Sequence, residues 1–358
     1  MWPLASRDQV CSFSKTHHTS LSSGMSLVSA FSSPGVRVRD AGELEAVCHK
    51  LSSKPSRGCV IEDLCVVLDG PFSLQALHQC LSLLPNLTDL VLLLYDPDIP
   101  ALFDGVHLPK IQYVRTNAGH HTMPGFLASH PTITMLQLLT PCEADCPLDG
   151  LELPHLRWIG GPSRCVSHLV HSELPRLTLE ASNSTSDPLL SLRSISTRIQ
   201  SLYILTVDFH VDDYDILSTV IAACSTIRKL KLVKKPPRPQ TRNSPRRAWN
   251  DGVSWSKALR KLPGLEELML RTASPLVPGS DDDGNEFDEY RALMCWVTGV
   301  RSTGRCDRPQ PHPALYHIGV WYRADDPNRN VVTHWSHRLG MWERTVMLRN
   351  RPMDYDFV

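Results

Sequence analysis

A spacing of apolar residues recurs through most of this 358-residue chain and constrains its fold more than any other feature. In the stretch 84–94, apolar side chains stand at a first position and then three and five residues later, at Leu87, Leu90 and Leu92. The period of such a repeat determines the fold of the whole chain. Full copies start at Ile61, Leu87, Ile133, Ile199, Ile227, Leu265 and Leu315, weaker ones at Ile111 and Leu156, and a shifted one at Leu177.

The distance between copies indicates the type of repeat. The first six steps fall within the range of about 20–29 residues found in leucine-rich repeats, and the last three are longer, as expected for units with inserted loops. Residues 73–84 and 213–224 have the periodicity of amphipathic helices, and Asp40 to Glu43 has the form of a helix N-cap. One strand and one helix cannot bury their own apolar faces, so the units must stack. We therefore predict an α/β leucine-rich-repeat solenoid, horseshoe-like, with about ten irregular strand-helix units.

Composition divides the chain into three parts. Residues 1–35 are Ser-rich and hold too few apolar side chains to pack, so we expect them to be disordered. The solenoid is predicted over 36–350, with loop insertions at about 234–252, 272–288 and 301–313, and 351–358 form a tail. The first insertion is basic and proline-rich and the second acidic, which places both on the surface. For the basic one, a nuclear-import signal, a phosphate-binding patch and a solvated insertion without a partner all remain open.

Charge and cysteine content limit the classes of partner. The chain has 37 basic and 37 acidic residues, which favours neither nucleic acid nor a membrane surface as a partner. Its 11 cysteines are scattered without paired spacing, as in proteins with reduced thiols. No run approaches the roughly 18 apolar residues needed to span a bilayer. We expect a cytoplasmic and/or nuclear protein.

Motifs for catalysis or metal binding are weak. Cys142 and Cys146 are four residues apart, but no second Cys or His pair follows at zinc-ligand spacing, so we expect no metal. His120 follows a glycine in an expected turn, where we expect it to be exposed. His334 and His337, three apart, could share a helix face but have no carboxylate at a recognised distance. With no phosphate loop or nucleophile elbow, we expect neither a cofactor nor an enzyme.

The repeat itself creates the best candidate site. The residues three and five after each start point into the core, so those at two, four and six point to the opposite, concave face. Aromatic and arginine side chains there would anchor a protein ligand, and the basic lean of the C-terminal half suggests an acidic or phosphorylated segment. The alternative is that these side chains serve only solubility and cross-strand packing. The candidates are Tyr113, Arg115, Trp158, Tyr203, Lys229, Lys231, Arg271, Trp321 and Arg323.

The Leu-Pro-x-Leu-x-x-Leu-x-Leu phrases, unequal repeat lengths and proline-rich insertions resemble the irregular leucine-rich-repeat proteins of fungi, many of which carry an F-box. The resemblance covers roughly residues 36–350. It implies a substrate-recognition subunit whose F-box docks on the adaptor of a cullin ubiquitin ligase. Residues 1–60 show no F-box pattern. The expected function is thus a protein-binding scaffold with an F-box-like receptor role, and the alternative is a scaffold or regulatory protein unrelated to ubiquitin.

Overall fold

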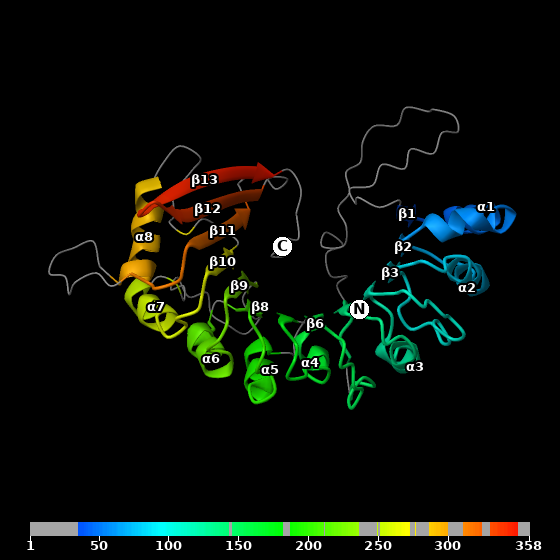
Figure 1. The fold of residues 1–358 in the computed structure, drawn as a ribbon, viewed down its shortest axis with the longest axis horizontal. Helices are drawn as coiled ribbons and strands as arrows, with labels where there is room; N and C mark the ends of the chain where they lie inside the picture. The colour runs from blue at the N-terminus through cyan, green and yellow to red at the C-terminus, as the bar shows by residue number, and fades with distance from the viewer. Residues whose placement is uncertain are drawn as a thin grey trace, which may run out of the picture.

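The chain forms an open α/β solenoid whose strands lie side by side along an arc (Figure 1). The computed structural model describes residues 35–142, 145–181, 187–210, 212–235, 249, 251–272, 276, 286–299, 311–323 and 330–349. The expected disordered segment before residue 35, the tail 351–358 and most of the three expected loop insertions lie outside these residues. None of the described helices is long and apolar enough to cross a bilayer.

A single sheet holds the strands in their order along the chain, from β1 to β13. Neighbours are parallel from β1 to β11, and the last two pairings are antiparallel. The strands are β1 (Gly35–Val38), β2 (Asp63–Leu68), β3 (Asp89–Leu94), β4 (Tyr113–Thr116), β5 (Met135–Leu138), β6 (Trp158–Pro162), β7 (Arg176–Glu180), β8 (Ile204–Phe209), β9 (Lys229–Lys234), β10 (Glu267–Arg271), β11 (His317–Arg323), β12 (Asn330–Arg338) and β13 (Met341–Arg349).

Helices line the outer side of the arc, and the strands line the inner, concave side (Figure 1). They are short, as expected for units that are completed by their neighbours. They are α1 (Ala41–Ser53), η2 (Pro55–Val60), α2 (Leu74–Ser82), η3 (His120–Thr122), α3 (Pro124–Ser129), α4 (Ser163–Val166), α5 (Pro188–Ile195), α6 (Ile216–Ala223), α7 (Gly252–Leu259) and α8 (Glu286–Thr298).

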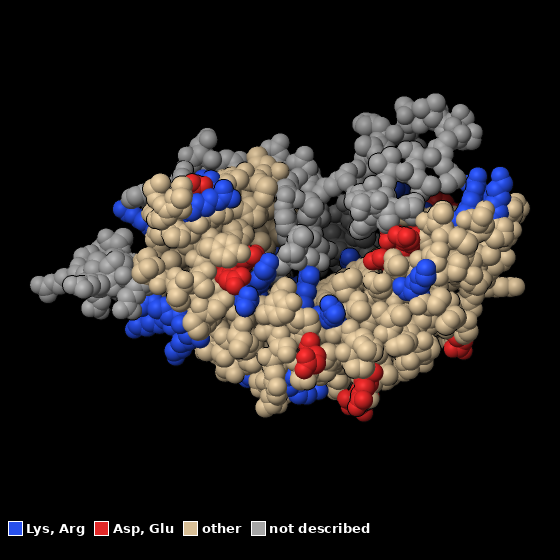
Figure 2. Space-filling view, in the orientation of Figure 1, with Lys and Arg blue, Asp and Glu red and all other residues tan. Residues whose placement is uncertain are grey.

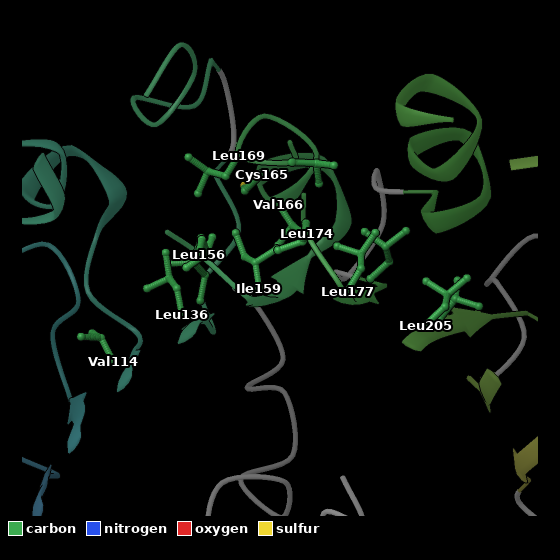
Figure 3. Close-up of a cluster of buried hydrophobic side chains, with 14 of the residues drawn as sticks. Val114, Leu136, Leu156, Ile159, Cys165, Val166, Leu169, Leu174, Leu177 and Leu205 are labelled. Carbon is green, nitrogen blue, oxygen red and sulfur yellow. The ribbon is translucent and has the colours of Figure 1, made fainter. Parts of the chain in front are cut away.

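The core lies between the sheet and the helices, and the repeated apolar positions fill it. The residues three positions after the first apolar residue of successive units pair across neighbouring strands, and their side chains stack as one row. Each is fully buried, and each contributes roughly 1.5–3 kcal/mol through removal from water. Figure 3 shows this row as Val114, Leu136, Ile159, Leu177 and Leu205.

Local sequence signals set the element boundaries. Asp40 and Ser73 act as N-caps, because their side chains accept the backbone N–H groups of Glu43 and Ala76. This confirms the cap expected at Asp40 and, within two residues, the helix expected over 73–84. The helix expected over 213–224 is α6, which spans 216–223.

The Leu-Pro phrases form turns at the entrance to several strands. Leu87 donates its backbone N–H to the carbonyl of Leu84, so Pro85 occupies the second position of a tight turn, where its fixed φ fits. The same bond links Ile111 to Leu108 and Leu265 to Leu262. Proline thus directs the chain from the helical layer into the sheet.

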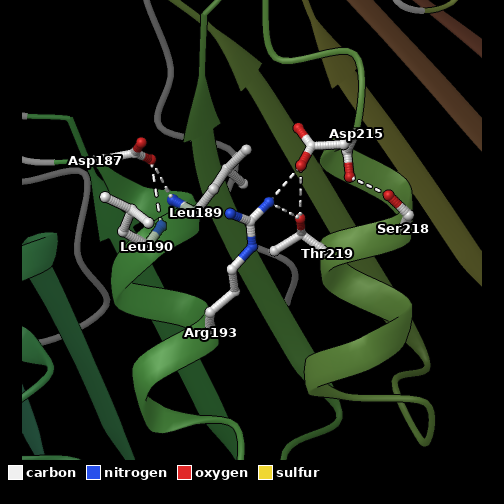
Figure 4. Close-up of polar contacts among 7 residues, drawn as sticks. All are labelled: Asp187, Leu189, Leu190, Arg193, Asp215, Ser218 and Thr219. Carbon is white, nitrogen blue, oxygen red and sulfur yellow. Dashed lines mark hydrogen bonds and ion pairs between the residues drawn. The ribbon is translucent and has the colours of Figure 1, made fainter.

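Neighbouring helices on the outer side are joined by polar contacts (Figure 4). Arg193 of α5 forms an ion pair with Asp215, the residue before α6, and donates to the Thr219 hydroxyl at 3.0 Å. Asp187 caps α5 through the N–H groups of its first turn. These contacts fix the spacing of α5 and α6 above strands whose separation is set by the sheet.

The structure corrects the register of the two units that contain β7 and β8, and in β8 the correction exchanges a core residue for a concave one. We expected Ile204 to point into the core, but its pairing with Lys229 places it on the concave face, and Leu205 and Val207 are the buried residues. The corresponding first position is therefore Leu202 rather than Ile199. Both leucine and isoleucine recur in this stretch, so the spacing alone fitted either frame.

The C-terminal end of the sheet was not expected. The β12–β13 hairpin turns at Leu339 and Gly340, both of which have positive φ, as a tight two-residue hairpin requires. His334 and His337 lie in strand β12 and not on a helix, so residues three apart face opposite sides of the sheet. The leucine spacing of the parallel units does not continue here.

Candidate concave-face site and a buried thiol-histidine cluster

Strand pairing arranges the concave side chains in rows across the sheet. One row runs through Tyr113, Met135, Trp158, Arg176, Ile204, Lys229, Glu267 and His317, and the next through Arg115, Gln137, Gly160, Thr178, Thr206 and Lys231. Because neighbouring strands lie about 4.8 Å apart, residues along a row touch one another.

An aromatic-arginine group occupies the middle of this face. The rings of Tyr113 and Trp158 stack with their centroids 6.0 Å apart, and the Arg176 guanidinium lies 5.0 Å from the Trp158 ring centre. The indole N–H of Trp158 donates to Thr178, and Tyr113 donates to Gln137. These contacts hold the rings in fixed orientations.

Sequence reasoning missed Arg176. The unit that contains it was read as starting at Leu177, whereas strand pairing places Leu177 at the buried third position. Counting from Leu174 puts Arg176 on the concave face, whereas the Leu174-Pro175 phrase, by analogy with Leu84-Pro85 before Leu87, indicates Leu177 as the first position.

Acidic residues partly neutralise the basic C-terminal half of the concave face. Glu267 accepts an ion pair from Lys229 at 3.0 Å and a hydrogen bond from the Tyr316 hydroxyl at 3.1 Å. It also lies 3.8 Å from His317, whose other ring nitrogen is 3.0 Å from His334. Burial lowers the pKa of His317, and the charge of Glu267 opposes that shift.

A second acidic residue, Asp208, lies on the concave side near the C-terminal end of β8 and is almost fully buried. Its carboxylate lies 2.9 Å from the Lys235 ammonium and accepts the backbone N–H of Ala181. Burial raises the pKa of Asp208, and the Lys235 charge counteracts this. Figure 2 shows basic and acidic side chains adjacent to each other on this side of the molecule. The excess of positive charge in the C-terminal half of the concave face is therefore smaller than the sequence suggested.

Four of the expected anchors differ from expectation. Tyr203 is 46% exposed but precedes β8 at the strand entrance and does not belong to the concave rows, because of the register shift. Trp321 is only 2% exposed, with the Arg271 guanidinium 4.4 Å from its ring centre. Lys231 and Trp158 are also buried. Arg323 lies in β11, but its side chain is outside the described part of the structure.

A cluster of three thiols and one imidazole lies in the middle of the solenoid, away from the concave rows. His120 Nδ1 is 2.9 Å from Cys142 Sγ and 3.3 Å from Cys146 Sγ, and the two sulfurs are 3.7 Å apart. The Cys142 backbone N–H donates to Cys165 Sγ at 3.4 Å. One ligand-type atom from each residue falls within 4.8 Å of all the others. His120 is 3% exposed, which corrects the expectation that it would lie on the surface.

The thiols of this cluster differ in acidity. A hydrogen bond from Cys146, with a further one from His120, lowers the pKa of Cys165 to about 4. The same bond raises the pKa of Cys146, and burial raises that of Cys142 to about 11. One sulfur is thus favoured as a thiolate that accepts hydrogen bonds from its neighbours.

Two surface hollows lie outside the concave rows. One, near the end of α2, includes His78, Asp104 and His107, and the other includes Lys110 and Arg157. Both are open to solvent, and neither joins a nucleophile to a base. Comparison of the chain with known protein families and with curated proteins gives no match.

Proposed function

We propose that this chain is a leucine-rich-repeat scaffold that binds a protein segment along its concave face and performs no catalysis. The observation that carries the proposal is the Tyr113–Trp158–Arg176 group, which is aromatic and basic and is held by stacking on a rigid sheet. Such side chains lose little conformational freedom on binding, and they are enriched among the residues that dominate interface energies.

The charge distribution suggests where the ligand lies. Lys229 and Lys235 already have carboxylate partners, so a ligand must compete with Glu267 and Asp208 to reach them. Arg115 and Arg176 flank the stacked rings on adjacent rows, and both are half-buried. We propose that an acidic or phosphorylated segment contacts these two arginines and crosses the sheet near β4–β7.

The role of an F-box-like receptor in a cullin ubiquitin ligase is the more specific form of this proposal. It rests on the repeat pattern alone, since β1 and α1, the first described elements, already belong to the solenoid. The alternative, a scaffold or regulatory role unrelated to ubiquitin, would use the same concave face. Recovery of a cullin adaptor separates these two forms.

The test is affinity purification of the tagged protein from its own cells, followed by mass spectrometry and by direct binding measurements with the recovered proteins. An Arg115→Glu/Arg176→Glu variant should lose the specific ligand, with at least about a tenfold loss of affinity. An Arg57→Glu/Lys257→Glu variant reverses the same number of charges at exposed positions outside the rows and should bind as the wild type does.

Equal recovery of every partner by both variants, with unchanged circular dichroism, would contradict binding by the concave face. A cullin adaptor retained by both variants would support the receptor form, because an adaptor is expected to dock elsewhere.

A further inference from the structure

The thiol-histidine cluster joins three consecutive units of the solenoid. His120 begins η3, after β4; Cys142 follows β5; and Cys165 lies in α4, after β6. Each stands nine residues after the first apolar position of its unit, which are Ile111, Ile133 and Leu156. Equivalent positions of successive units stack in a solenoid, so the three side chains converge. Cys146 adds a fourth donor to this set.

We propose that His120, Cys142, Cys146 and Cys165 bind one zinc ion in a closed, structural site. Three thiolates and one imidazole form one of the usual ligand sets of structural zinc. Four protein ligands leave no coordination position for substrate, so the ion would hold the chain together and take no part in a reaction.

The distances suit one tetrahedral ion. Sulfur at about 2.3 Å and nitrogen at about 2.0 Å from zinc stand roughly 3.5–3.8 Å from one another. The sulfurs of Cys142 and Cys146 are 3.7 Å apart and match this spacing, whereas the His120 contacts of 2.9 and 3.3 Å would lengthen to about 3.5 Å around the ion. A disulfide needs about 2.05 Å between sulfurs, and all three cysteines are free thiols. A maximum separation of 4.8 Å leaves room for a single ion.

The surroundings also suit a bound metal. The imidazole approaches the sulfurs of Cys142 and Cys146 through Nδ1, the ring nitrogen that would bind the ion. The Cys142 backbone N–H directed at Cys165 Sγ is the kind of contact that stabilises a thiolate ligand. Cys165 itself lies beside Val166 and Leu169 in the apolar core, which excludes water (Figure 3).

The position explains what the ion would stabilise. α4 has 4 residues and η3 has 3, and among the described residues between β5 and β6 no helix covers the sheet. In these units the six-residue α3 and buried loop residues such as Leu148 and Leu169 cover the core in place of longer helices. A metal bound by three units would add to this packing, because binding free energy at a site absent from the unfolded chain stabilises the fold.

The first test measures metal in the full chain, purified without chelator, by inductively coupled plasma mass spectrometry. We expect about one zinc ion per chain for the wild type and less than about a fifth of that for Cys146→Ser. Cys224→Ser, which alters a buried thiol outside the cluster, should retain the full amount. Less than about a tenth of an equivalent of any metal in the wild type would overturn the proposal.

A second test needs no variant, so it is independent of misfolding. Cobalt(II) titrated into metal-free wild type should give the intense visible absorption of a tetrahedral thiolate site, saturate at one equivalent, and disappear when zinc is added. Cobalt binding should also raise the midpoint temperature of thermal unfolding. Weak absorption of the octahedral aqueous type, or a Cys142–Cys146 or Cys146–Cys165 disulfide found by mass spectrometry in freshly purified protein, would overturn the proposal.

Discussion

Most charged side chains described on the concave face lie beside a partner of opposite charge, as Glu267 lies beside Lys229 and Asp208 beside Lys235. Asp89 is different, because its neighbour across the strands is another carboxylate, Asp63. The Asp89 carboxylate also accepts a hydrogen bond from the Thr88 hydroxyl at 2.7 Å. Burial raises the pKa of Asp89, and the charge of Asp63 raises it further. Two neighbouring carboxylates therefore destabilise the N-terminal end of the sheet at neutral pH.

We predict that Asp89→Asn raises the unfolding free energy by about 0.5 kcal/mol at pH 7. Since the folded-state pKa of Asp89 is raised, its favourable contribution is present at low pH and is lost as pH rises through that pKa. The advantage of the variant should thus vanish as pH falls toward about 4. Urea denaturation at several pH values measures this, with Asp69→Asn, at an exposed position, as the control. A pH-independent difference would contradict the role of charge.

At the scale of elements, strand register decides which side chains form the core and which face a ligand. A shift of one residue exchanges the two faces of a strand. In β8 the pairing places Ile204 between Arg176 and Lys229 on the concave side and buries Leu205 completely. The two residues are adjacent and similar in size, so they make a matched pair.

We predict that Leu205→Asp lowers the unfolding free energy by about 4 kcal/mol, because it buries an unpaired charge in the core. Ile204→Asp should cost at most about 1 kcal/mol, because the new carboxylate lies between two basic neighbours. Chemical denaturation of both variants measures the difference. A larger loss of stability for Ile204→Asp than for Leu205→Asp would instead support the register expected from the sequence, in which Ile204 is buried.

Across the whole molecule, each unit contacts mainly its neighbours, and the C-terminal end is closed by a different structure. The Glu289 carboxylate of α8 accepts the Trp335 indole N–H at 2.9 Å and lies 3.3 Å from Arg344. It is 4% exposed, so β12 and β13 are held to α8 by a buried polar network. In a solenoid, damage to an end should remain local.

We predict that Glu289→Ala destabilises this end by about 2–3 kcal/mol, because it leaves buried donors without an acceptor. Hydrogen exchange measured by mass spectrometry should increase in α8, β12 and β13 and stay unchanged in β2–β5. Glu343→Ala, at an exposed position on β13, is the control. A uniform increase along the chain would show that the solenoid unfolds as one unit.

The sequence alone determined the strands β2–β6 and β9–β11, the buried residues within most of them, and the helix cap at Asp40. These follow from local spacing, since an apolar pattern fixes which side of a short strand is buried wherever the units stack. It also indicated the two faces of the sheet, and hence most of the candidate concave residues.

Only the tertiary structure decided the rest. The frames of β7 and β8, the pairing of Lys229 with Glu267 and the closing hairpin depend on contacts between segments that no local pattern relates. The thiol-histidine cluster is the clearest case: its residues show no paired spacing in the sequence, because they come from three units. They meet because stacking brings equivalent positions of successive repeats together.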